Sequence, residues 1–165
     1  MVKYINNPIK FKGNMTSDVD IVLKVGYKYG IDEALSIYTS KIYVNHWVGL
    51  KYRYSTKDSC KHALNADQTY KLLKEYKRAV LIVGNKKDDF NKAVLEMENQ
   101  LVQEGYYKAL ALINGPCSLC KKENPARPSL ESLGIDILAT VRKFKKNVPQ
   151  PKVGEYPPYA IILVI

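Results

Sequence analysis

The sequence has few residues of the types that form disulfides, bind metals or act as nucleophiles. It contains three cysteines and two histidines among 165 residues. The stretch MVKYINNPIKFKGN has no apolar segment, so we expect no secretory signal. No apolar run approaches the roughly 20 residues that a membrane helix needs. We therefore expect a cytoplasmic protein without a membrane contact, in which an odd number of reduced thiols forms no disulfide framework.

Several catalytic motifs are also missing. Gly84 follows an apolar run, but the Gly-Lys-Ser/Thr pattern of a phosphate-binding loop does not follow it. There is no Gly-x-Ser-x-Gly motif. A Cys–His dyad would require His46 or His62 to meet a cysteine in space, and spacing alone does not show this. The sequence contains no motif that identifies a reaction, so whether the chain is an enzyme stays open.

Negative charge is scarce relative to positive charge. The chain carries 26 Lys and Arg residues against 16 Asp and Glu residues, and 22 of the cations are lysines, which gives a net charge of +10. Arginine is the cation favoured for bidentate recognition of phosphates and bases, whereas lysine mainly solubilises a surface. The charge therefore leaves two interpretations open. The surface is simply solvated, or it contacts nucleic acid, an anionic ligand or an acidic protein.

The apolar patterns predict one domain. We expect an irregular lead-in over residues 1–15 and a single α/β domain over 16–165. Helices are predicted at 16–30, 66–76, 88–105 and 130–144, the last broken at Gly134, and strands at 34–39, 41–54, 78–84, 107–115 and 159–165. Alternation of strands and helices predicts a sandwich with a mixed, partly parallel sheet flanked by helices.

The expected strand 41–54 has apolar residues at alternate positions, with Ile42, Val44, Val48 and His46 on one face. On such a face we interpret His46 as a core histidine with a satisfied hydrogen bond.

Two cysteines form a C-x-x-C motif directly after the expected strand 107–115. This spacing lets the sulfurs of Cys117 and Cys120 converge on one ion. Lys121 and Lys122 follow at once and would favour the thiolate form. Three interpretations stay open: a metal site, a redox pair, or a turn that carries inert thiols.

Cys60 and His62 lie in a polar segment between expected elements. Ligands of open α/β sheets bind outside the carboxyl ends of the strands, and this segment could reach the edge where the C-x-x-C motif lies. Three thiolates and one imidazole would complete a ligand set for zinc or an iron–sulfur cluster. An accessible loop thiol is the alternative for Cys60.

Charged and polar residues follow the C-x-x-C motif. Arg127 and Ser129 precede an expected helix, whose free backbone amides favour anions, so with Lys121 they could hold a phosphate or carboxylate. Alternatively, Arg127 bonds local carbonyls and Ser129 caps the helix. Glu131 and Asp136 could act as acid and base, although on a helix such residues are more often surface or cap residues.

The stretches GPCSLC and ARPSLESLGID resemble the paired signature of a family of predicted metal-binding proteins of unknown function, domain-of-unknown-function family 2284. The matching positions are Gly115, Pro116, Cys117, Leu119, Cys120, Ala126, Arg127, Pro128, Ser129, Glu131, Gly134, Ile135 and Asp136. The apolar ending YAIILVI also suits the terminal strand of that family.

The chain also departs from this family. Members carry more cysteines, some of them between the two stretches, where this sequence has only KKENP. The resemblance therefore implies a cysteine-depleted member. Its metal site would consist of Cys60, Cys117 and Cys120 and would hold an iron–sulfur cluster or zinc, or nothing if the site is degenerate. A metal-free interaction module and a thiol redox protein are the two alternative functions.

Overall fold

The computed structural model describes residues 31–55, 63–84, 89–115, 126–153 and 155–165. The expected lead-in 1–15 and helix 16–30 lie outside these ranges. Within them the elements are β1 (Ile31–Tyr38), η1 (Thr39–Lys41), α2 (His46–Ser55), α3 (Ala66–Lys74), β2 (Arg78–Gly84), α4 (Phe90–Gln103), β3 (Leu110–Ile113), η2 (Glu131–Leu133), α5 (Ile137–Phe144) and β4 (Tyr159–Leu163). No helix in the described ranges is both long and apolar enough to cross a membrane.

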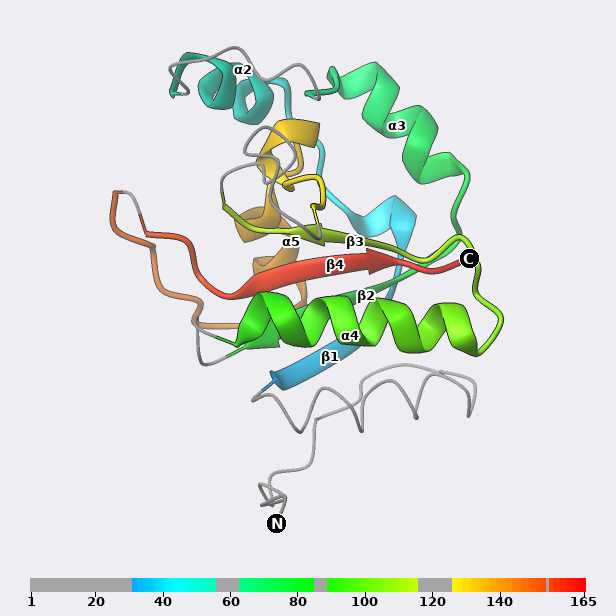
Figure 1. Cartoon of the computed structure of the whole chain (residues 1–165). Helices are drawn as coiled ribbons and strands as arrows, with labels where there is room; N and C mark the ends of the chain where they lie inside the picture. The colour runs from blue at the N-terminus through cyan, green and yellow to red at the C-terminus, as the bar shows by residue number, and fades with distance from the viewer. Residues whose placement is uncertain (1–30, 56–62, 85–88, 116–125, 154) are drawn as a thin grey trace.

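The four described strands form one sheet in the order β1-β2-β4-β3, and each neighbouring pair is antiparallel (Figure 1). The prediction of a mixed, partly parallel sheet was therefore wrong. Because β2 and β3 are both antiparallel to β4, they run in the same direction, as expected for strands joined by the helix α4. The C-terminal strand β4 lies between β2 and β3, so these two strands, which run in the same direction, do not pair with each other.

The insertion of β4 has a physical reason. All residues of Tyr159–Leu163 are buried, as are the residues of β2 between its two ends. Strands that are apolar on both faces are most stable in the middle of a sheet, where helices cover both sides. The predicted C-terminal strand is thus confirmed, and burial at the centre ties the end of the chain to the domain.

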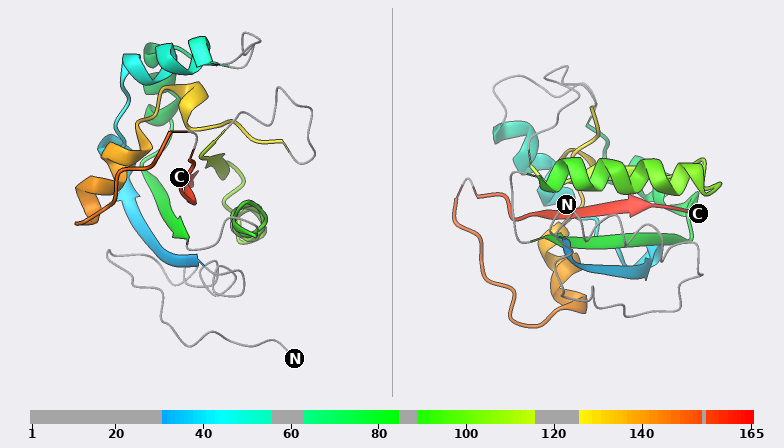
Figure 2. Two further views of the ribbon diagram at one scale, coloured as in Figure 1. Left: turned by 90° about the vertical axis from the view of Figure 1, so that its left-hand side faces the viewer. Right: turned by 60° about the horizontal axis from the view of Figure 1, so that its bottom comes forward.

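Helices cover both faces of the sheet (Figure 2). On one face lies α4, whose predicted apolar stripe is confirmed: Phe90, Val94, Met97 and Leu101 are all buried. The elements α3, η2 and α5 pack on the opposite face, and their apolar side chains share a core with alternate residues of β2 and β4. Each large apolar side chain buried in these layers stabilises the fold by about 1.5–3 kcal/mol.

The predicted strand 41–54 was wrong. Val44 forms one isolated bridge to Ile135, and the chain then turns into helix α2. Val48 and Tyr52 are four residues apart, so they share the buried side of this helix. A spacing of four satisfies strand alternation as well as helical periodicity, and this explains the error. His46 begins the helix and is exposed, so it is not the core histidine that we expected.

The segment after Ser129 is divided as predicted. A short turn of helix, η2, ends at Gly134, and α5 begins three residues later. Gly134 has a φ of +71°, a left-handed conformation that costs glycine little.

Candidate metal centre

The segment that carries the C-x-x-C motif connects β3 to Ala126 in the sequence. The Ile113 amide donates to the Pro128 carbonyl at 3.3 Å, and the Leu130 amide donates to the Ile113 carbonyl at 2.9 Å. Ile113 and Ser129 thereby form a parallel bridge. The two ends of the segment are held side by side. Cys117, Cys120 and Lys121 themselves lie outside the described residues.

The segment that carries Cys60 and His62 also lies outside the described residues, but its ends are fixed. It follows α2, and after it the Leu64 amide donates to the Ser132 carbonyl at 3.0 Å. The helix α2 packs on η2, with Gly49 close to the Gly134 backbone. Both cysteine-bearing segments are therefore attached to the same stretch of chain, residues 129–134.

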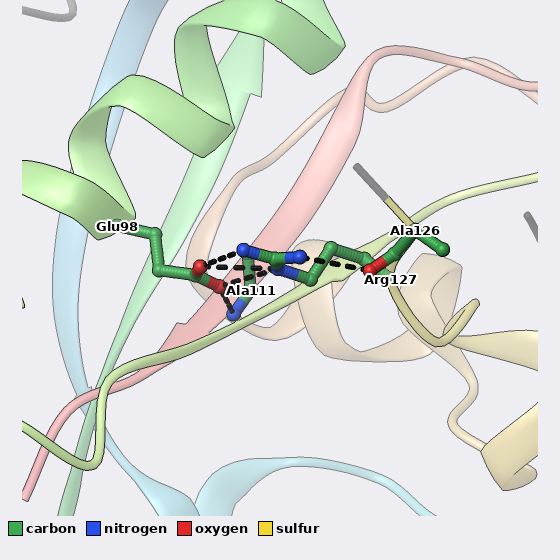
Figure 3. Close-up of polar contacts among 4 residues, drawn as sticks. All are labelled: Glu98, Ala111, Ala126 and Arg127. Atoms are coloured by element: carbon green, nitrogen blue, oxygen red, sulfur yellow. Dashed lines mark hydrogen bonds and ion pairs between the residues drawn. The ribbon is translucent and has the colours of Figure 1, made fainter. Parts of the chain in front are cut away.

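Arg127 forms an ion pair with Glu98 (Figure 3). Its Nε donates to both carboxylate oxygens at 3.0 Å, Nη2 donates to Oε1, and Nη1 donates to the Ala126 carbonyl at 2.8 Å. The hydrogen bond to Glu98 is the main cause that raises the pKa of Arg127 above its ordinary value, while burial opposes it. The guanidinium is therefore held against α4.

Glu98 makes a second contact, which the sequence did not suggest. Its Oε2 accepts a hydrogen bond from the Ala111 amide in the edge strand β3. One buried carboxylate thus joins α4, β3 and the segment that follows the C-x-x-C motif. Because this contact satisfies an outward amide of β3, it also helps protect a sheet edge from pairing with another chain. The available signal was a glutamate four residues after Val94, on the apolar side of α4.

Ser129 is buried and stabilises the turn that follows. Its Oγ accepts a hydrogen bond from the Ser132 amide at 3.1 Å, and the Ser132 hydroxyl donates to the Ser129 carbonyl at 2.8 Å. These contacts, and that of Arg127 with the Ala126 carbonyl, are of the kind expected from the alternative interpretation, in which both residues make local hydrogen bonds and bind no anion. An anion site made of Lys121, Arg127 and Ser129 stays a prediction.

The two acidic residues of the signature have different surroundings. Asp136 caps α5 by accepting from the Ala139 amide at 3.0 Å, and it also accepts from Asn45 Nδ2 at 3.1 Å. The side-chain carboxylate of Glu131 accepts no hydrogen bond from a described residue, although its backbone carbonyl accepts one from the Gly134 amide at 2.9 Å. Burial raises the pKa of Glu131 above its ordinary value, and the nearby positive charge of Lys51 partly offsets this effect.

Within the described ranges, no group of three or more His, Cys, Asp or Glu side chains is arranged to hold a metal ion. All three cysteines lie outside those ranges. The described part of the chain therefore supplies the frame for the cysteine-bearing segments and not a ligand set of its own.

Comparison with known proteins gives one match. The family described as "Predicted metal-binding protein (DUF2284)" matches residues 36–164. No curated protein and no solved structure matches the chain. The match covers most of the sequence and includes both signature stretches, which lie at the two ends of the bridged segment. The chain therefore belongs to the DUF2284 family of predicted metal-binding proteins.

Proposed function

We propose that this protein binds a metal through the thiolates of Cys117 and Cys120, with Cys60 as a third ligand. The observation that carries the proposal is the attachment of both cysteine-bearing segments to residues 129–134, by the bridge from Ile113 to Ser129 and the hydrogen bond from Leu64 to Ser132. Membership of a family of predicted metal-binding proteins supports it.

The bridged ends favour metal binding for an entropic reason. A metal can only bind several thiolates after the chain has brought them together, and closing a longer loop costs more entropy. Here ten residues separate Gly115 from Ala126, and the backbone on both sides is already hydrogen bonded. The fold therefore meets part of the cost before the metal arrives.

The donor set suits zinc or an iron–sulfur cluster. Three thiolates with His62 would make a tetrahedral Cys₃His set of the kind that holds structural zinc. An iron–sulfur cluster is also held by thiolates, although four is the usual number. When bound, either centre would cross-link two segments that are far apart in the sequence.

The test is metal analysis and absorption spectroscopy of the full chain purified without oxygen. We expect about one zinc ion per chain, or iron and sulfide with a broad visible band if a cluster is present. Separate substitutions of Cys117, Cys120 and Cys60 by alanine should each remove or strongly weaken binding. Ser118→Ala is the matched control, because it changes the same motif without removing a thiolate.

Three results would count against the proposal. Well-folded, colourless and metal-free protein would favour an interaction module. A low thiol pKa with reversible oxidation of Cys117 and Cys120 would favour a redox pair. Full metal binding by the Cys60→Ala protein would exclude that residue as a ligand while leaving a site at the other two cysteines.

A further inference from the structure

A pocket of about 520 Å³ lies between α2, η2, α5 and the connection that leads to β4. Figure 1 shows α2 at the top and this connection at the left. Pockets for small molecules usually have volumes of roughly 300–1,000 Å³. Four of the lining residues are aromatic, namely Trp47, Tyr52, Tyr156 and Tyr159. The space is therefore large enough for a small molecule with an apolar body.

Three carboxylates line the pocket, and two of them already have partners. Asp136 accepts hydrogen bonds from the Ala139 amide and from Asn45. Glu155 accepts from the Lys152 amide at 3.0 Å. The side-chain carboxylate of Glu131 accepts no hydrogen bond from any residue of the described ranges, and burial raises its pKa. A partly desolvated carboxylate without a partner is costly, so it is the group of this pocket best placed to receive a cation.

Two lysines, Lys51 and Lys152, also line the pocket, and Lys51 does not pair with Glu131. Lys51 and Glu131 both line this pocket, and the charge of Lys51 lowers the pKa of Glu131. No ion pair within 4.0 Å joins Lys51 to Glu131 in the described part of the chain. Two opposite charges that face one pocket but do not touch are complementary to a ligand with separated opposite charges.

We propose that this pocket binds a small zwitterion with an apolar body, of the amino-acid type. Its ammonium group would pair with Glu131, its carboxylate would pair with Lys51, and its apolar part would lie among the aromatic side chains. This site uses none of the cysteines, so it can be tested independently of the proposed metal centre.

Trp47 makes the proposal directly testable. It is the single tryptophan of the chain and it lines the pocket, so its fluorescence reports on occupation. Three probes share one body and differ in charge: L-phenylalanine, 2-phenylethylamine and 3-phenylpropanoate. We expect the full chain to bind L-phenylalanine most tightly, because only this probe can satisfy both charges.

Two substitutions then separate the two contacts. Glu131→Gln should weaken L-phenylalanine binding about tenfold or more, the effect of losing a hydrogen bond between charged groups, but leave 3-phenylpropanoate binding unchanged. Lys51→Met should weaken L-phenylalanine but not 2-phenylethylamine. Glu155→Gln is the matched control, since it removes a carboxylate of the same pocket that already has a backbone partner.

The proposal is overturned if no probe changes Trp47 fluorescence at millimolar concentration. Equal affinities for the three probes, or an unchanged response of the Glu131→Gln protein to L-phenylalanine, would overturn it as well. Circular dichroism checks that each variant is folded, and an unchanged metal content in the Glu131→Gln protein would show that the two sites are separate.

Discussion

Substitution of Glu98 by alanine tests whether one carboxylate holds together α4, β3 and the segment after the C-x-x-C motif. Glu98 is 5% exposed, and it accepts hydrogen bonds from the Ala111 amide and from the Arg127 guanidinium. The substitution would leave a buried amide and a guanidinium without their acceptor. Both groups lose a partner that water can replace only in part.

The magnitude follows from the two lost contacts. An unsatisfied buried amide costs about 1–3 kcal/mol, and a hydrogen bond to a charged group contributes about 1.5–3 kcal/mol. The Arg127 side chain is 24% exposed, so water can solvate part of the guanidinium, and the lower ends of these ranges apply. We expect Glu98→Ala to lower the free energy of unfolding by about 3 kcal/mol, which is a large part of the roughly 5–15 kcal/mol of a typical domain.

Urea unfolding followed by circular dichroism measures this change. Glu96→Ala is the matched control, because Glu96 is an exposed residue of the same helix and should change stability by less than about 0.5 kcal/mol. Glu98→Gln should have an intermediate effect, since its carbonyl can still accept from the Ala111 amide. If Glu98→Ala cost no more than Glu96→Ala, the role assigned to this carboxylate would be refuted.

Three further substitutions test the surroundings of the signature. Because burial raises the pKa of Glu131 in the folded protein, protonation favours the folded state, and stability declines as the pH rises through the folded pKa. Glu131→Gln should therefore raise the melting temperature at pH 7 but not below the ordinary pKa of 4.5. An equal rise in melting temperature at both pH values would contradict this. Gly134→Ala should lower the free energy of unfolding in urea by about 1 kcal/mol, because a φ of +71° disfavours a residue with a side chain. An unchanged urea midpoint would show that the backbone at residue 134 adjusts to alanine without this loss. Asp136→Ala removes the cap of α5 and should cost about 0.5–2 kcal/mol, whereas Asp136→Asn should restore most of it if capping is the cause.

The candidate site was predictable in part. The position of the C-x-x-C motif after a buried strand and the family signature both follow from neighbouring residues in the sequence. The partner of Arg127 did not follow, because Glu98 is 29 residues away and meets it only after α4 packs on the sheet. The pocket likewise depends on α2, which an ambiguous spacing of apolar residues concealed.

The sequence by itself determined which segments are apolar on one face or on both. It therefore predicted the helix α4, the buried strands β2 and β4, and the break at Gly134. Only the tertiary structure decided that β4 lies between β2 and β3, that Val48 and Tyr52 face inward from a helix, and that Glu98 binds Arg127. The physical reason is that periodicity reports how one segment is buried, whereas the choice of neighbours depends on competition among all buried segments for the same core.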